Sequence, residues 1–278
     1  MAFSVVMLAN EIGGCRRQEP AAMHNVRASD RVGTIVCNHP AAARLFEELK
    51  IDFCTRGQLS LAEACDQQHL DLNATLAALH RLTSPMLAGG LTRPADLSLT
   101  ELTHHIESTH HAYLHEHLPH LQRLASEVAS RHGDRDSRLI KLRTVIDHLA
   151  SELSSHLHQE EAVLFPWIRH LDAGDVAPQG VANDSAAGAM LQMDREHTEA
   201  AAQLNQLRAL SDDFTCPAWG SSSYQELMAA LQSFEVDLHL HVHKENNELF
   251  PRAIALQSMQ RSAIKGLAGP ARLQPPDP

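Results

Sequence analysis

The sequence predicts an all-α protein, in which an antiparallel four-helix bundle follows a small helical N-terminal domain. Aromatic residues make up only 4% of the 278 residues, and the residue types that dominate favour helices over strands. Four long segments with helical apolar spacing, joined by connections rich in Gly, Pro, Asn and Asp, are typical of such a bundle. Two of these segments carry the same His- and Glu-containing motif.

Charge and cysteine usage exclude several classes of function. The formal net charge is −11 without any Lys/Arg-rich run, which argues against a nucleic-acid partner. The five cysteines contain no C-x-x-C pair, so we expect no disulfide framework and a reducing compartment. Because no stretch approaches the ~20 apolar residues of a membrane span, we expect a cytoplasmic protein without a membrane partner. The oligomeric state is left open, with a homodimer as one option.

The N-terminal third divides into a leader and a small domain. Residues 1–30 have no clear period and contain helix breakers, which predicts a loosely ordered leader. Residues 31–90 are predicted to form the helical domain, with helices over 41–49, 61–67 and 72–82. Ser60 and Glu63 have the spacing of a capping box for the second of these helices. Gly89, Gly90 and Pro94 mark the linker that follows.

Residues 96–257 are predicted to form the bundle. Its first helix begins at Ser98 or Thr100 and ends near His132. The other three are expected over about 136–170, 185–210 and 221–256. Residues 258–278 end in Pro-Pro-Asp-Pro, which predicts a flexible tail.

The repeated motif lies in the second and fourth helices of the predicted bundle. Both copies read H-x-H-x-E, then three residues, then Leu-Phe-Pro, with an offset of 85 residues. The copies place His156 with Glu160 and His241 with Glu245, and residues four apart share one helix face. One H-x-x-x-E arises often by chance on a His-rich helix, but a second copy with the same Leu-Phe-Pro makes chance a poor explanation. We therefore predict two metal half-sites that face each other across the bundle.

A two-metal site in a bundle core takes side chains from all four helices. His197 is the one internal histidine of the third helix. The first helix offers several, namely His104, His105, His110, His111, His115, His117, His120 and His132. We favour His111, which precedes Pro119 by eight residues, because this gap resembles the ten residues that separate the motif histidines from their prolines. His132 would lie about 31 Å further along a continuous helix and could not share the site.

The candidate ligands are therefore four imidazoles and two carboxylates without thiolate: His111, His156, Glu160, His197, His241 and Glu245. Such a set does not suit a structural Cys-rich zinc site. Imidazole with carboxylate suits iron best, with manganese or zinc as weaker alternatives. His158 and His243 lie about 200° around the helix from the motif's first histidines, so we expect both to face away from the metals.

These residues resemble a known family, the iron–sulfur cluster repair di-iron proteins of the YtfE/ScdA type, which have hemerythrin-like bundles. The resemblance rests on His111-Ala-Tyr-Leu, Glu196-His197-x-Glu-Ala and both motif copies with their Leu-Phe-Pro ends. The segments Ile51-Asp-Phe-Cys54 and Leu61-Ala-Glu-Ala-Cys65 are similar to the N-terminal domain of that family. The resemblance covers roughly residues 32–252.

The resemblance implies that the six candidate residues bind two iron ions, with both glutamates and an oxo group bridging the pair. One departure concerns the N-terminal domain. Where the family usually has Cys-Cys-Gly-Gly, this chain has Cys54-Thr55-Arg56-Gly57, so a function that needs a vicinal thiol pair is not expected. The family also has a histidine at the place of His132, whose role is left open.

The function expected from the resemblance is repair of iron–sulfur clusters damaged by oxidants or nitric oxide, by supply of iron to client iron–sulfur proteins. Oxygen-carrying hemerythrins are a poorer match, because they use a second histidine on the third helix where this chain has Ala201. Two alternatives remain open at the same centre. One is reduction of nitric oxide or peroxide, which would make the chain an enzyme, and the other is oxygen or redox sensing.

Overall fold

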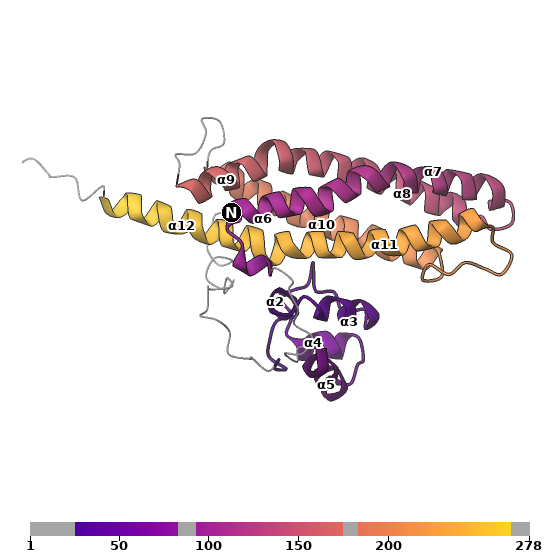
Figure 1. Cartoon of the computed structure of the whole chain (residues 1–278), viewed down its shortest axis with the longest axis horizontal. Coiled ribbons are helices and arrows are strands. Elements are labelled where there is room, and N and C mark those ends of the chain that lie inside the picture. Colours follow the sequence, from indigo (N-terminus) through magenta and orange to yellow (C-terminus); the bar gives the residue numbers. More distant parts are fainter. Residues whose placement is uncertain (1–25, 83–92, 175–182, 268–278) are drawn as a thin grey trace, which may run out of the picture.

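The structure is a computed structural model that describes residues 26–82, 93–174 and 183–267. Within these ranges every named element is a helix, which confirms the predicted fold class. Four long helical segments lie side by side in an elongated bundle, and the N-terminal helices lie against one side of it (Figure 1). None of the described helices is long and apolar enough to cross a membrane.

The N-terminal domain consists of four short helices around a small apolar core. Phe46, Phe53, Leu61 and Leu79 are fully buried in it. The predicted capping box is confirmed, because the Ser60 hydroxyl accepts a bond from the Glu63 amide at 3.2 Å and the Glu63 carboxylate accepts one from the Ser60 amide at 2.8 Å. The helices are α2 (Val32–Asn38), α3 (Ala42–Glu48), α4 (Leu61–Gln67) and α5 (Leu72–Leu82).

Two expectations for this domain are corrected by the structure. Helix α2 was not predicted, because it has only seven residues and five of them are buried, too few to show a helical period with a polar face. The ordered domain also begins before residue 31. Val26 is buried, and its carbonyl accepts a hydrogen bond from His80 Nε2 at 2.9 Å. Residues 1–25 of the predicted leader and the linker residues 83–92 lie outside the described residues.

The bundle follows the predicted order, and three of its four segments contain a π-helical turn. The first segment begins at Ser98, whose side chain forms a capping box with Glu101. A short 3-10 helix, η1 (Pro94–Asp96), precedes it. The first segment is α6 (Leu99–Ile106), η2 (Glu107–His111) and α7 (Ala112–His132); the second is α8 (Arg138–Gln159), η3 (Glu160–Leu164) and α9 (Phe165–Ala173); the third is α10 (Asn183–Leu210); the fourth is α11 (Ser222–Lys244), η4 (Glu245–Leu249) and α12 (Phe250–Leu267).

The fourth segment is longer than expected. The sequence predicted its end near Leu256, whereas α12 continues to Leu267, so the first residues of the predicted tail are helical. Residues 268–278 lie outside the described residues.

The π turns η3 and η4 explain the repeated Leu-Phe-Pro. Each turn ends at the leucine, and the next α-helix begins at the phenylalanine with proline as its second residue. Proline donates no backbone hydrogen bond and clashes with the carbonyl four residues earlier in a regular α-helix. A wider turn just before Pro166 and Pro251 accommodates both prolines without ending the helix.

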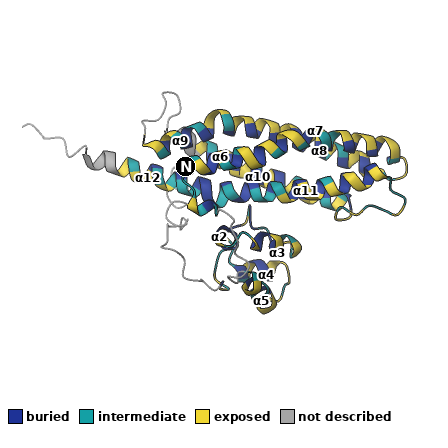
Figure 2. Ribbon diagram, in the orientation of Figure 1, coloured by how far each residue is buried: buried dark blue, intermediate teal, exposed yellow. Residues whose placement is uncertain are grey.

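The bundle interior is divided into two apolar clusters. One lies toward the loop at His132 and includes Leu114, Leu153 and Leu238, and the other lies toward α9 and includes Ile106 and Leu164. Buried residues line the facing sides of the helices throughout (Figure 2). The positions between the two clusters along the helices are therefore where buried polar residues gather.

The N-terminal domain docks on α11 and η4 through polar contacts. Asn247 Nδ2 donates hydrogen bonds to the carbonyls of Phe53 and Cys54 at 3.3 and 3.1 Å. His239 Nδ1 lies 2.6 Å from the Glu47 carboxylate. Gly33 and Gly57 let the domain approach closely, because a Cβ on either would lie within 2.3 Å of Asn247 Oδ1.

Replacing Gly57 by alanine should therefore weaken docking. The new Cβ would lie 2.1 Å from Asn247 Oδ1 and 2.9 Å from the Phe53 carbonyl, so we expect a loss of about 1–3 kcal/mol in the free energy of unfolding. Urea unfolding and limited proteolysis of the N-terminal domain would measure it. The matched control is Gly188→Ala on α10, where nothing lies within 4 Å of the added Cβ. Equal stability of the Gly57 variant and wild type would contradict the close approach.

Candidate metal centre

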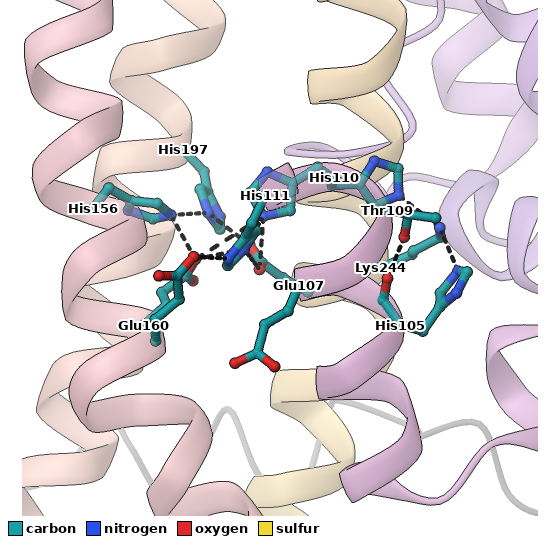
Figure 3. A network of polar contacts seen from close by, with 12 residues as sticks. His105, Glu107, Thr109, His110, His111, His156, Glu160, His197 and Lys244 are labelled. Carbon is teal, nitrogen blue, oxygen red and sulfur yellow. Dashed lines mark hydrogen bonds and ion pairs between the residues drawn. The ribbon is translucent and has the colours of Figure 1, made fainter. Parts of the chain in front are cut away.

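Six buried side chains from all four bundle segments converge between the two apolar clusters. The π turns supply three of them, because His111 ends η2, Glu160 begins η3 and Glu245 begins η4. Single π turns within α-helices are frequent at functional sites. Figure 3 shows His111, His156, Glu160 and His197 pointing toward one another. The six residues are those selected from the sequence, and each is at most 4% exposed: His111, His156, Glu160, His197, His241 and Glu245.

The six residues form two overlapping groups of metal-ligand type. His111 and His241 belong to the first group, His156 and His197 belong to the second, and both groups contain Glu160 and Glu245. Within each group the potential ligand atoms all lie within 4.8 Å of one another. The glutamates are thus the shared members of two adjacent sites.

The distances show how each carboxylate faces both histidine pairs. Glu160 Oε2 lies 3.4 Å from Nε2 of both His111 and His156. Each oxygen of Glu245 contacts a different histidine pair. Oε1 lies 2.9 Å from His241 Nε2, and Oε2 lies 3.1 Å from His197 Nε2. Within each pair the histidine Nε2 atoms are 3.2 Å apart. Nitrogen and oxygen lone pairs therefore converge on two adjacent points.

The electrostatics of this layer indicate that a cation belongs in it. Both carboxylates are fully buried, and neither oxygen of Glu160 has a hydrogen-bond partner. Burial and the neighbouring Glu245 charge raise the pKa of Glu160. A buried carboxylate without partners is costly, and metal ions would compensate both charges. Four imidazoles and two carboxylates without thiolate suit iron among the common metals, so the residues present fit such a group.

In three of the four histidines, the Nδ1 atom on the side of the ring away from the centre contacts a side-chain oxygen. Each of these oxygens belongs to a residue that is next to a candidate ligand in the sequence. The Nδ1 atoms of His111, His156 and His197 lie 3.0, 2.7 and 2.9 Å from side-chain oxygens. Such outer contacts fix the ring orientation and leave Nε2 for a metal. Sequence reasoning did not assign these roles, although adjacency to a ligand was a usable signal. The outer partners are Glu161, Glu196 and Asn246 in the same order.

The fourth histidine, His241, has a different environment. Its Nδ1 atom has no hydrogen-bond partner, and its ring stacks on His110 with centroids 5.7 Å apart. His110 is itself held by Asp237 at 2.8 Å and by Lys244 Nζ at 2.6 Å. Burial lowers the pKa of Lys244 to about 8. This buried polar chain beside the centre, visible in Figure 3 with His105 at its outer end, was not predicted.

A cavity of about 190 Å³ between α8 and α10 reaches the centre. His156, His197 and His241 are among the residues that line it. Three carboxylates also line it, namely Glu152, Glu196 and Glu199. The cavity offers a route for small cations or small molecules between solvent and the six residues.

The remaining histidine predictions can also be compared with the structure. His132 Nε2 lies 3.0 Å from the Ser221 hydroxyl, and its ring packs on Trp219 at the far end of the bundle. It does not share the site, as the distance argument predicted. His158 is exposed and His243 is buried against the N-terminal domain, and neither belongs to the two groups.

Cys54 marks the position where the chain departs from the resembling family. Its thiol is buried and donates a hydrogen bond to Asp52 Oδ1 at 3.2 Å. Burial and the Asp52 charge raise the pKa of this thiol, so it stays protonated. No disulfide joins the four cysteines in the described ranges.

Comparisons with known proteins separate the chain into the same two parts, the N-terminal domain and the bundle. Residues 102–253 match the hemerythrin HHE cation binding domain, and residues 28–83 match ScdA_N, a domain of unknown function. The chain is 31% identical over 227 residues to a probable iron-sulfur cluster repair protein of Haemophilus influenzae, covering 82% of this chain and 97% of that protein. The chain belongs to the iron–sulfur cluster repair family. Two further relatives of this family, both named iron-sulfur cluster repair protein YtfE, come from Yersinia pseudotuberculosis and Dickeya chrysanthemi. Each is 31% identical and covers 80% of this chain and 96% of the relative.

The metal-free form of this family member should be most stable near pH 6.5. Burial opposes the charged form of His111, but Glu160 and Glu245 raise its pKa to about 10. The stability from that proton is complete below pH 6.5 and is lost as the pH rises, and the net decline falls between pH 6.5 and about 8, because above pH 8 the lowered pKa of Lys244 offsets it. Burial lowers the pKa of His241 to about 3 and that of His243 to about 4. Because only the unfolded chain then gains these protons, stability also falls as the pH drops below 6.5.

Urea midpoints of the metal-free protein on both sides of this pH would measure the effect. Metal loading should abolish the alkaline decline, because a ligating histidine has already lost its proton. A metal-free protein whose midpoint rises between pH 6.5 and 8 would contradict the arrangement around His111.

Proposed function

We propose that the six converging residues bind two iron ions bridged by Glu160, Glu245 and an oxo group. The observation that carries this proposal is the pair of overlapping groups that share both glutamates. One ion would be held by His111 and His241, and the other by His156 and His197. When bound, the ions supply redox chemistry and exchangeable coordination, because each is held by fewer protein atoms than an octahedral ion accepts.

We further propose that the chain repairs damaged iron–sulfur clusters by supplying iron to client proteins. Family membership supports the repair function, since the relatives carry that name over nearly their whole length. The acid-lined cavity supports iron supply. Its carboxylates, Glu152, Glu196 and Glu199, would attract a cation leaving the centre. The cytoplasmic location and the homodimer remain predictions.

A transfer experiment tests this function. The iron-loaded protein would be mixed anaerobically with a client whose four-iron cluster has lost one iron, in the presence of a chelator that captures free iron. We expect client activity to return as iron leaves the chain. The Glu245→Ala variant, taken through the same iron loading, is the control and should restore nothing. Failure of the client to recover while iron stays on the chain would overturn iron supply.

Reduction of nitric oxide or peroxide is the second candidate, favoured by the cavity of about 190 Å³ that reaches His156, His197 and His241. A space of this size admits a small molecule, and an external reductant would have to supply electrons. Consumption of nitric oxide with a reductant, without any recovery of the client, would select this function. Sensing would be selected if neither client repair nor turnover occurred while the iron changed its oxidation state with oxygen.

A further inference from the structure

The fourth bundle segment is contacted from two sides, by the residues of the metal centre and by the N-terminal domain. His241 and Glu245 belong to the centre. Two residues further along in each case, His243 and Asn247 contact the N-terminal domain. Two residues correspond to about 200° around an α-helix, so the two pairs lie on opposite faces of the segment. Leu240 also packs against the apolar core of that domain. The segment is therefore enclosed between the domain and the centre.

Asn247 lies where the two sets of contacts meet. It belongs to the π turn η4, which begins at Glu245, and it follows Asn246, whose side chain contacts His197 Nδ1 at 2.9 Å. Asn247 Nδ2 donates hydrogen bonds to two backbone carbonyls of the N-terminal domain at 3.3 and 3.1 Å. This one turn thus carries a shared glutamate of the centre, the outer partner of His197 and an anchor of the N-terminal domain.

The N-terminal domain also holds the segment just before Glu245. His243 Nδ1 lies 3.3 Å from the Phe53 carbonyl, and His243 Nε2 lies 3.7 Å from Cys37 Sγ. The rings of Phe53 and His243 meet edge-on with centroids 5.4 Å apart. Contacts with the domain therefore fall on both sides of Glu245 along the chain, and docking restrains the backbone that places its two oxygens.

The first copy of the repeated motif lacks this connection. Its residue at the position of Asn247 is Ala162, which is exposed. The π turn η3 forms around Ala162 all the same, so Asn247 is not needed to make such a turn. What Asn247 adds is a connection from the turn to the N-terminal domain.

We propose that Asn247 is a positioning residue that couples docking of the N-terminal domain to metal retention at the centre. The docked domain holds η4 from outside, in the conformation in which Glu245 faces both histidine pairs, and bound ions hold the same turn from inside. Two binding events that favour one conformation strengthen each other by the same factor. This inference rests on the iron binding proposed above. Under iron supply, a client that displaces the domain would loosen the iron.

Iron release tests the coupling in one direction. The iron(II)-loaded protein would be mixed anaerobically with excess chelator, and the chelate would be followed by its absorbance. Gly57→Ala weakens docking without changing any bundle residue, and Asn247→Leu removes the anchoring amide at similar size. We expect both to release iron about tenfold faster or more. Gly133→Ala is the control, because its Cβ would lie 2.4 Å from the Ala129 carbonyl at the far end of the bundle. It should lose stability without a change in release rate.

Thiol labelling tests the opposite direction and needs no variant. Cys54 is buried in the larger apolar cluster of the bundle, whereas Cys65 is buried in the core of the N-terminal domain itself. Undocking therefore exposes the first thiol and leaves the second covered. We expect iron loading to slow the labelling of Cys54 by iodoacetamide about tenfold or more, with a smaller change at Cys65. Peptide mass spectrometry would measure both rates.

Two results would overturn the coupling. One is faster labelling of Cys54 in Gly57→Ala and Asn247→Leu with iron release at the wild-type rate, and the other is labelling of wild-type Cys54 that does not respond to iron. If Asn247→Leu does not fold, Gly57→Ala and the wild-type labelling still decide the question. A wild-type chain that retains no iron after loading would refute the iron binding itself, so the two failures are distinguishable.

Discussion

Replacing Glu245 by alanine is expected to remove both metal ions, although it deletes a single side chain. Its two oxygens lie 2.9 Å from His241 Nε2 and 3.1 Å from His197 Nε2, so each of the two sites loses a ligand at once. Loss of an outer partner alone typically lowers metal affinity by about 10–100-fold, and loss of a shared ligand should exceed that. Glu160→Ala should behave in the same way, because Glu160 Oε2 is equally far from His111 and His156.

The matched control for these variants is Glu116→Ala, an exposed glutamate on α7. Iron per chain after anaerobic loading and desalting would be measured for all three variants. The control should keep its iron, and the other two should lose nearly all of it. Retention of two irons in Glu245→Ala and Glu160→Ala would refute the bridging role of the glutamates, and retention of one would show that the sites are separate.

Removal of the metal is expected to lower the melting temperature by about 10 °C or more. A ligand present at about 1,000 times its dissociation constant stabilises the folded state by about 4 kcal/mol. Each kcal/mol of stability changes the melting temperature of a domain of this size by about 2–4 °C. Without metal, the bundle keeps two buried carboxylates, and both oxygens of Glu160 have no hydrogen-bond partner. Thermal unfolding before and after chelation would measure the shift.

The Glu245→Ala variant provides the control for this shift. Because it cannot hold the ions, its melting temperature should not respond to chelation or to added iron. If wild type loses its iron to the chelator and unfolds at an unchanged temperature, the polar layer is stable by itself and the ions contribute nothing to folding.

Much of the centre could be predicted from the sequence because its signal is periodic. His156 with Glu160 and His241 with Glu245 share the i, i+4 spacing, and the duplicated Leu-Phe-Pro made chance a poor explanation. His111 was selected among many histidines by its distance to Pro119, and the structure brings it to the other five. The capping box at Ser60 was likewise a local pattern and was predicted correctly. For the first bundle helix the sequence left Ser98 and Thr100 as alternatives, and the structure selects Ser98.

What could not be predicted depends on contacts between segments far apart in the sequence. The π turn at His111 has no residue signature that separates it from α-helix. The prolines after η3 and η4 indicate a disturbed helix, but they do not specify a π turn. Helix α2 is too short to show a period. The pairing of Cys37 with His243 spans 206 residues and arises only when the N-terminal domain docks on the bundle. His243 could be predicted to face away from the centre, but not what it would face.

The number and identity of the metal ions per chain test the central claim most directly. Elemental analysis of the anaerobically purified wild-type chain, loaded with iron and desalted, should find two irons bound per chain, which is the number of groups that share Glu160 and Glu245. Stoichiometric zinc in place of iron, or a single iron that does not increase on further loading, would contradict a carboxylate-bridged di-iron centre.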